Sequence, residues 1–455
     1  MSSMEELQRE VERLQLENAR LKEQLEKAEL NEQLAGSRES TDPKPQNNAT
    51  DKYPLTLEEY HRYGRQMIVE ETGGVEGQVK LKNAKVLVIG AGGLGCPLLP
   101  YLAGAGVGTI GIVDNDTVDP SNLHRQILHD SYSVGMLKCD SAKRALNRLN
   151  PNVNVTTYPV RLDNTNAFQI FEGYNLIMDC TDTPVTRYLI NDVAVNLGLT
   201  VVSASGVRTE GQLTILNFEN MGPCYRCFYP VPPSPNSVSS CQEGGVIGPC
   251  IGVLGVMMAV EAMKVILGLY STDDFEPFLM QYAGFPKQSL RTFRMRRRKE
   301  MCAACGTNPT ITREAIETSK INYTEFCGSR NYNVCVPEER ITVQQFDNEY
   351  LKVTSPGCIL LDVRPEHHYQ ISHLPNTYNI TVKSLRNMDG SLDELQKHIP
   401  SVSKDSDIVV LCRFGNDSQL ATRLLKDDFG INNVKDVQGG FFKYIDDIDP
   451  SIPKY

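Results

Sequence analysis

Residues 85–95 read Lys-Val-Leu-Val-Ile-Gly-Ala-Gly-Gly-Leu-Gly, and this stretch constrains the fold more than any other part of the chain. β-Branched and leucine residues that end in glycines are typical of a buried parallel strand entering a tight turn. Residues 96–106 carry apolar side chains at helical spacing, and residues 109–113 form a second predicted strand. The pattern predicts a βαβ unit whose backbone N–H groups can approach a phosphate at a helix N-terminus.

Polar residues beyond the second predicted strand indicate which nucleotide is bound. Asp114 lies about twenty residues past the glycines, where an acid can bind a ribose hydroxyl. Asn122 and Arg125 follow in a polar loop, and Lys138 and Asp182 lie farther along. Two cations beside a glycine turn suit a triphosphate, and a carboxylate can hold Mg²⁺ through water. The residues therefore favour ATP, whereas the glycine fingerprint alone fits an NAD-dependent oxidoreductase or a turn without a ligand.

The same strand–helix rhythm continues through the first part of the chain. It predicts helices at 138–149 and 187–197, and strands at 153–160, 176–180 and 200–204. Alternation of this kind is typical of an α/β fold with a doubly wound, Rossmann-like parallel sheet. With 455 residues, the chain is long enough for two or three domains with cores of their own.

Composition excludes several classes of function. The net charge of −10 argues against direct nucleic-acid binding, because phosphate recognition needs a basic face. We expect no membrane association, because no apolar run approaches the length of a membrane span. Thirteen cysteines without an apolar signal core favour a reducing compartment, and we expect the cytosol.

Two Cys-x-x-Cys pairs, Cys224 with Cys227 and Cys302 with Cys305, predict a metal site. Each pair offers two thiolates with the spacing that a shared metal needs, and two pairs complete a tetrahedral site. Redox dithiols are the alternative. The presence of two pairs, with no helix expected to start at either, favours one structural Zn²⁺ per subunit.

A second, smaller α/β domain is predicted around Cys412. Residues 358–364 form a buried strand that ends in an Asp and an Arg, and residues 407–411 form another strand that runs directly into Cys412. A short polar loop closes at Ser418 before a predicted helix at 419–426. Backbone N–H groups and the helix dipole at such a position stabilise a thiolate or a persulfide anion. A buried structural cysteine is the alternative.

An N-terminal segment and two linkers lie outside the two predicted α/β domains. Heptad-spaced apolar residues with Asn18 at a core position predict an N-terminal helix, either a short coiled coil or a solvated single helix. The expected boundaries are an N-terminal helix at 1–30, a linker at 31–54, a nucleotide-binding α/β domain at 55–315, a linker at 316–338 and a second α/β domain at 339–455.

The first of these domains resembles the ubiquitin-activating-enzyme-like adenylyltransferases. Glycines 90–95, Asp114, the segment 121–126, Lys138 and the segment 179–182 carry the resemblance. It implies an ATP–Mg²⁺ site formed by Gly93, Asp114, Ser121, Asn122, Leu123, His124, Arg125, Lys138, Asp182 and Thr183. It also implies a homodimer in which Arg65 reaches the triphosphate of the neighbouring protomer. Family members carry an acyl-accepting cysteine in the loop at 230–249, and Cys241 occupies that position. The resemblance agrees with the zinc assignment.

The second domain resembles the rhodanese family through its Asp-Val-Arg strand, the six-residue loop after Cys412, and residues 438–440. A phosphatase loop would end in an arginine, whereas this ring closes at Ser418. Together the two domains resemble the eukaryotic molybdopterin-synthase sulfurylases. That resemblance implies adenylation of the C-terminal glycine of a small ubiquitin-like carrier, followed by sulfur transfer from a Cys412 persulfide to give a thiocarboxylate. Cys241 either forms a thioester or resolves the intermediate as a disulfide with Cys412.

The implied partners are the molybdopterin synthase small subunit, a ubiquitin-related modifier, and a cysteine desulfurase or other sulfur donor. The reaction would serve molybdenum cofactor biosynthesis and tRNA wobble-uridine 2-thiolation. An activating enzyme for protein conjugation is an alternative that leaves Cys412 without a task. A non-catalytic scaffold is another, and it leaves the pocket residues unexplained.

Overall fold

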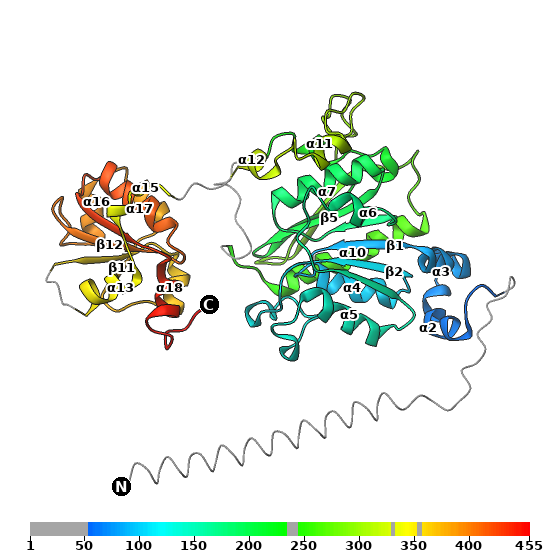
Figure 1. Cartoon of the computed structure of the whole chain (residues 1–455), viewed down its shortest axis with the longest axis horizontal. Helices are drawn as coiled ribbons and strands as arrows, with labels where there is room; N and C mark the ends of the chain where they lie inside the picture. Colours follow the sequence, from blue (N-terminus) through cyan, green and yellow to red (C-terminus); the bar gives the residue numbers. More distant parts are fainter. Residues whose placement is uncertain (1–52, 234–243, 329–332, 353–356) are drawn as a thin grey trace, which may run out of the picture.

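The computed structural model describes residues 53–233, 244–328, 333–352 and 357–455 (Figure 1). The predicted N-terminal helix at 1–30, nearly all of the linker at 31–54, and Cys241 lie outside these residues. The described residues form two α/β units, each with its own sheet and covering helices (Figure 1).

The larger unit is built on an eight-stranded sheet with the order β3-β2-β1-β4-β5-β6-β7-β8. The first five strands in this order run parallel, as predicted, whereas β6, β7 and β8 pair antiparallel, which the sequence pattern did not indicate. The strands are β1 (Lys85–Ile89), β2 (Thr109–Val113), β3 (Asn154–Tyr158), β4 (Leu176–Asp179), β5 (Thr200–Val207), β6 (Glu210–Leu216), β7 (Phe278–Ala283) and β8 (Ser289–Arg294).

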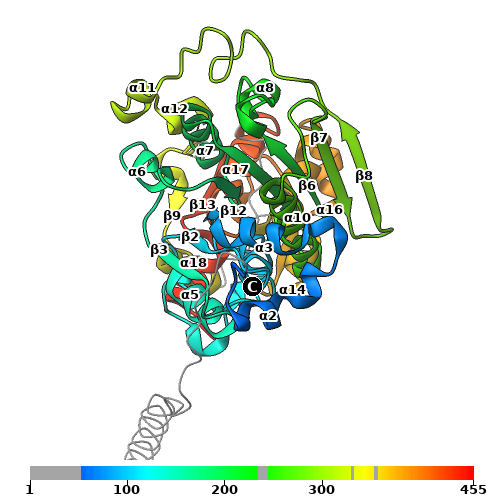
Figure 2. The same ribbon diagram turned by 90° about the vertical axis from the view of Figure 1, so that its right-hand side faces the viewer.

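Helices cover both faces of this sheet (Figure 2). Val86 and Val88 of β1 pack into the core beneath α4, α5 and α10, and Leu87 and Ile89 pack into the core beneath α6 and α7. Successive residues of a strand point to opposite faces of the sheet. Because helices cover both faces here, every residue of β1 after Lys85 is buried, which explains its continuous apolar run. The covering helices are α2 (Leu57–Met67), α3 (Gly74–Asn83), α4 (Gly95–Gly104), α5 (Lys138–Leu149), α6 (Ala167–Phe171), α7 (Pro184–Leu197), α8 (Tyr225–Phe228) and α10 (Gly248–Leu267).

Helix α10 corrects one expectation. By length and composition, its 20 residues are long and apolar enough to cross a membrane. The helix packs against α4, β5 and β6, and half of its most apolar window is buried in the core. A helix that covers the middle of a large sheet can match a membrane span in length and composition, because both bury many apolar side chains.

The segment expected to be a linker at 316–338 contains the end of α11 (Arg313–Glu317) and the whole of α12 (Tyr323–Cys327). Ile316 and Tyr323 are buried against α7, and the Asn164 side-chain amide donates to the carbonyls of Ile316 and Ile321, each at 3.0 Å. This part of the segment therefore packs onto the larger unit, in contrast to the expected connection.

The smaller unit is a five-stranded parallel sheet with the order β11-β10-β12-β13-β9. Separate apolar clusters on its two faces again give three layers. Its elements are β9 (Arg340–Ile341), α13 (Val343–Gln345), β10 (Ile359–Asp362), α14 (Glu366–Ile371), β11 (Thr377–Asn379), α15 (Val382–Asn387), α16 (Leu392–His398), β12 (Asp407–Leu411), α17 (Asp417–Asp427), β13 (Asn433–Val437) and α18 (Gly440–Asp447). The predicted fold class is confirmed.

Candidate functional site

The glycine turn between β1 and α4 is shaped by close backbone contacts. Gly90 has a φ of 99°, and a Cβ there would lie 3.0 Å from the Cys180 carbonyl oxygen. A Cβ on Gly95 would lie 2.1 Å from the Gly90 carbonyl oxygen. A side chain at either position would push the turn away from the strand ends, so glycine is required there.

A cavity of about 730 Å³ lies against this turn, at the carboxyl ends of β1, β2 and β4. Ligands of open α/β sheets bind at this edge. Of the residues expected to bind ATP, the cavity is lined by Gly93, Asp114, Asn122, Arg125, Lys138, Asp182 and Thr183. The tertiary structure thus brings together residues from three separate strand ends.

Asp114 is tied to the glycine turn. The Ala91 N–H donates to Asp114 Oδ2 at 2.8 Å, and the Asp116 N–H donates to Oδ1 at 2.9 Å. Burial raises the pKa of Asp114, while Lys138 and these two N–H groups oppose the rise. The carboxylate is therefore held at a fixed place on the cavity wall.

The two cations that the sequence predicted for the cavity, Arg125 and Lys138, are also held by neighbours. Arg125 donates to the Asn122 side-chain oxygen at 2.6 Å and to the Ser121 carbonyl at 3.1 Å. The Lys138 ammonium lies 2.9 Å from Asp116 Oδ2, and the lysine side chain is 6% exposed. Fixed cations of this kind offer a triphosphate hydrogen-bond donors and positive charge without reorganisation.

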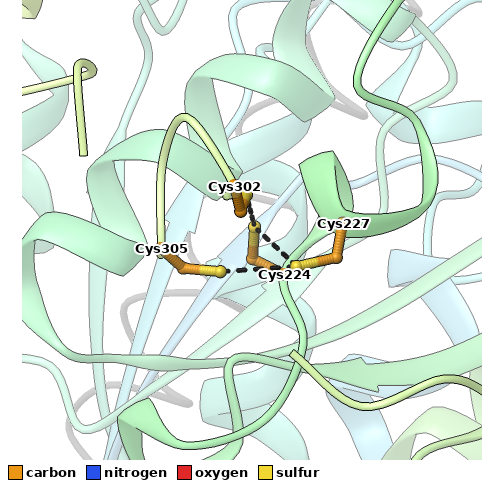
Figure 3. A group of neighbouring side chains, drawn as sticks. All are labelled: Cys224, Cys227, Cys302 and Cys305. Atoms are coloured by element: carbon orange, nitrogen blue, oxygen red, sulfur yellow. Dashed lines mark hydrogen bonds between the residues drawn. The ribbon is translucent and has the colours of Figure 1, made fainter. Parts of the chain in front are cut away.

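The two Cys-x-x-Cys pairs meet in one buried cluster (Figure 3). All four Sγ atoms lie within 4.8 Å of one another, including 3.6 Å between Cys224 and Cys302 and 3.4 Å between Cys227 and Cys305. Four sulfurs at about 2.3 Å from a tetrahedral Zn²⁺ ion would lie about 3.8 Å apart, so this donor set fits a metal ion. Hydrogen bonds among the sulfurs lower the pKa of Cys227 and raise that of Cys224, which favours a thiolate within the cluster.

One premise of the zinc prediction differs from the structure. The one-turn helix α8 begins directly after Cys224, which is its N-cap residue, whereas no helix was expected at either pair. A thiol at a helix start is a feature of redox dithiols. The convergence of both pairs in one buried cluster nevertheless favours metal binding, because isolated dithiols do not require four converging sulfurs.

Cys412 lies where β12 ends, ahead of α17, and is 3% exposed. The Gly415 N–H donates to Cys412 Sγ at 3.1 Å, and Ser418 Oγ lies 3.4 Å from the sulfur. Burial raises the pKa of Cys412, and hydrogen bonds from Ser418 oppose the rise. Two other buried cysteines differ, because Cys96 and Cys139 direct their thiols to backbone carbonyls. An N–H donor on the sulfur suits an anion, whereas a carbonyl suits a thiol.

Comparison with known proteins accounts for both sites in one chain. Residues 63–304 match the ThiF family and residues 347–447 match the rhodanese-like domain. The adenylyltransferase and sulfurtransferase UBA4 of Saccharomyces cerevisiae is 66% identical over 457 residues, covering 99% of each chain. The proteins of the same name from Kluyveromyces lactis and Eremothecium gossypii are 63% and 60% identical, covering 100% of this chain and 99% and 98% of theirs.

The chain belongs to the UBA4-type adenylyltransferase and sulfurtransferase family. It is an enzyme that combines nucleotidyl transfer with sulfur transfer. The ThiF domain of a UBA4-type enzyme implies ATP, and the cavity at the glycine turn lies within the ThiF segment. Cys412 lies within the rhodanese-like segment.

Four residues of the predicted ATP site do not line the cavity of this UBA4-type chain: Ser121, Leu123, His124 and Arg65. Ser121 and His124 contact Arg125 instead, through the Ser121 carbonyl and through His124 Nε2 at 2.7 Å. Arg65 lies in the last turn of α2. Cys241, the predicted acyl acceptor, lies outside the described residues.

Several residues that line the cavity were not predicted from the sequence. Asp116 pairs with Lys138, and its signal was its position two residues after Asp114. Arg187 donates to the Thr181 carbonyl at 2.7 Å and lies 4.0 Å from the Asp179 carboxylate. Tyr225, located in the sequence between Cys224 and Cys227, also lines the cavity. Tyr225 has no local signal, because its place depends on how α8 packs against α7.

Proposed function

We propose that this enzyme adenylates the C-terminal glycine of small ubiquitin-like sulfur carriers and then converts the acyl-adenylate into a thiocarboxylate with sulfur carried on Cys412. The observation that carries the proposal is the pairing, in one UBA4-type chain, of a cationic cavity at a glycine turn with a cysteine that accepts a backbone N–H. Each site supplies one half of the reaction.

The first half needs an activated carboxylate, because attack on a free carboxylate must expel an oxide. The carrier carboxylate attacks the α-phosphorus of ATP, and the P–O bond to pyrophosphate breaks with its electron pair leaving on pyrophosphate. Positioning and charge neutralisation are sufficient for this step. Arg125 and Lys138 would neutralise the phosphates, Asn122 would orient Arg125, and Asp114 would bind the ribose.

Two metal ions are part of the proposal. Mg²⁺, held by Asp182 together with ATP, would neutralise charge on the departing pyrophosphate. Zn²⁺ would be bound by Cys224, Cys227, Cys302 and Cys305 as a structural ion, which the buried four-sulfur arrangement supports.

The second half begins when the Cys412 thiolate attacks a donor's sulfane sulfur. A new S–S bond forms, and the donor's S–S bond breaks with its electron pair leaving on the donor thiolate. The terminal sulfur of the persulfide then attacks the acyl-adenylate carbonyl and AMP leaves. Attack of a second thiol on Cys412 Sγ forms a disulfide and releases the thiocarboxylate. Cys241 would be that thiol or an earlier acyl acceptor, and an external thiol then reduces the disulfide.

We further propose a homodimer in which Arg65 enters the partner's cavity. Two observations support it: Arg65 does not line the cavity of its own chain, and Val253 and Val260 leave apolar surface exposed on α10. The two valines lie seven positions apart, on one face of the helix, where they could add to an apolar contact between protomers.

The molybdopterin synthase small subunit and a ubiquitin-related modifier are the proposed carriers, and a cysteine desulfurase or another sulfur donor supplies the sulfur. The enzyme would act in the cytosol, in the eukaryotic sulfurylase role, for molybdenum cofactor biosynthesis and tRNA wobble-uridine 2-thiolation. Intact-mass analysis of each carrier after incubation with enzyme, ATP and a sulfur donor tests the proposal. Exchange of one oxygen for sulfur is expected. A carrier that is adenylated yet never gains sulfur contradicts it.

A further inference from the structure

A fully buried carboxylate lies one hydroxyl group away from the sulfur of Cys412. Ser418 Oγ is 3.4 Å from Cys412 Sγ and donates to Asp436 Oδ2 at 3.3 Å. Asp436 is 0% exposed, and so is Ser418. The three side chains form a short chain from the sulfur to the interior of the domain.

This arrangement opposes the chemistry that Cys412 must perform. Sulfur transfer needs an anion on Cys412, first as a thiolate and then as a persulfide. A second negative charge that is linked to the sulfur through one buried hydroxyl, in a site that excludes water, disfavours that anion. In the thiol state Ser418 also directs its proton to Asp436, so its oxygen lone pairs face the sulfur.

Arg340 neutralises the carboxylate. Its Nε donates to Asp436 Oδ1 at 2.9 Å, and its NH2 group donates to Oδ2 at 3.1 Å. The two residues are register partners in the β9–β13 ladder, so sheet pairing itself positions the ion pair. The same NH2 group lies 3.3 Å from the Gly415 carbonyl, in the loop whose N–H contacts Cys412.

We propose that Arg340 is a positioning residue for sulfur transfer, because its pairing with Asp436 cancels the carboxylate charge and frees Ser418 to turn its proton toward the sulfur anion. This inference rests on the proposed role of Cys412 as the sulfur carrier. When the Cys412 proton passes to solvent, the Ser418 hydroxyl rotates to donate to sulfur. Asp436 then loses the hydrogen bond from Ser418 but keeps the two hydrogen bonds from Arg340.

Other charged groups near Asp436 do not replace Arg340. Glu339 adds negative charge, and it is itself paired with Lys426 at 2.7 Å and with Arg423. The Cys335 thiol also lies within the field of Asp436, and Asp417 acts on Cys412. Burial raises the pKa of Asp436 and the Arg340 hydrogen bonds oppose this rise, so the ion pair keeps the carboxylate charged and compensated.

The test uses four variants of the full-length protein: Arg340→Gln, Asp436→Asn, the double variant, and Arg423→Gln. Arg423→Gln is a matched control, because it removes an ion pair to Glu339 without touching Asp436. The measurements are the rate of alkylation of Cys412 by iodoacetamide against pH, read on the Cys412 peptide by mass spectrometry, and sulfur transfer from thiosulfate to cyanide. Thermal unfolding of every variant checks folding.

We expect Arg340→Gln to raise the pKa of Cys412 by roughly one unit and to slow both reactions about tenfold at pH 7. Asp436→Asn is expected to lower that pKa, and the double variant to return close to the wild type. The control should match the wild type. A purely structural ion pair predicts instead that the double variant is as slow as Arg340→Gln, and that result overturns the proposal.

Two further outcomes decide the remaining cases. If Arg340→Gln does not fold, Asp436→Asn alone still tests the idea, because an unchanged or raised pKa of Cys412 contradicts it. Cys412→Ala separates this inference from the proposed function: sulfur that remains on a Cys412→Ala enzyme refutes the carrier role. The pKa of Cys412 in the other variants is measured by alkylation, so it does not depend on whether Cys412 carries sulfur.

Discussion

Arg226, located between the two cysteines of the first pair, is bound to Asp192 in the middle of α7. Its Nε and NH2 groups each donate to a carboxylate oxygen at 2.8 Å. The rings of Tyr188 and Phe326 each lie 4.7 Å from the guanidinium carbon. Because α7 begins at Pro184, on the wall of the nucleotide cavity, this contact joins the four-cysteine cluster to the ATP site.

Removal of one partner of this ion pair should destabilise the larger unit strongly. We expect Asp192→Ala to lower the free energy of unfolding by about 3–5 kcal/mol, because Arg226 would remain buried without its partner. Arg313→Ala is the control, because Arg313 pairs with Glu172 at the surface and should change the melting temperature little. Chemical denaturation of both variants measures the difference, and equal stability of the two would contradict this account.

Metal removal should act through the four-cysteine cluster. We expect one zinc ion per chain in the purified enzyme, and nearly none in a Cys302→Ser variant with a reduced melting temperature. Cys358→Ser serves as the control, because Cys358 lies in the other unit and outside the cluster. Elemental analysis with thermal unfolding provides the readout. Full zinc content in the Cys302→Ser variant would rule out this ligand set.

The two activities should be separable by substitution. We expect Lys138→Ala and Asp182→Ala to lower carrier-dependent ATP–pyrophosphate exchange by about 100-fold or more, because each removes charge stabilisation from the cavity. Thiosulfate-to-cyanide sulfur transfer should persist in both variants. Cys412→Ala should show the reverse pattern. Loss of both activities in every variant would show that the two sites do not work independently.

Gly440 should be essential for the loop of Cys412. A Cβ at Gly440 would lie 2.4 Å from the Cys412 carbonyl oxygen and 2.6 Å from the Gly415 nitrogen. We expect Gly440→Ala to reduce sulfur transfer by displacing the N–H that contacts the sulfur. Gly430→Ala is a matched control with a similar φ of 69°, and its Cβ would only contact the Lys404 side chain at 3.9 Å, so both variants share the backbone strain without the clash. Equal activity of the two variants would exclude the steric explanation.

Sulfur loading of Cys412 should accelerate as pH rises. Burial raises the pKa of Cys412 above its ordinary value, so the reactive thiolate is the minor form near neutrality. Below that pKa the thiolate fraction, and hence the loading rate, should increase about tenfold per pH unit. Ser418→Ala should shift the profile to higher pH, because Ser418 hydrogen bonds lower this pKa. Stopped-flow measurement of sulfur loading with a persulfide donor gives the pH profile. A loading rate that does not change between pH 6 and 8 would refute the prediction.

Local patterns predicted the elements that carry the sites. Helix α5 begins at Lys138 and ends at Leu149, and β12 covers residues 407–411, both as expected. These elements can be predicted from the sequence because apolar periodicity, and the glycines that end a strand, depend on only a few neighbouring residues. The same reasoning placed Asp114 and Cys412 correctly, since each directly follows a buried strand.

The sequence by itself thus determined the fold class, the glycine turn, the identity of the four cluster cysteines and the position of Cys412. The tertiary structure alone decided which distant side chains meet: Arg340 binds Asp436 across 96 positions, and Arg226 reaches Asp192 across 34. It also decided the antiparallel direction of β6 to β8. Those contacts depend on the order in which strands and helices pack. That order is set by the burial of whole apolar faces, and it cannot be predicted from the residues that are adjacent in the chain.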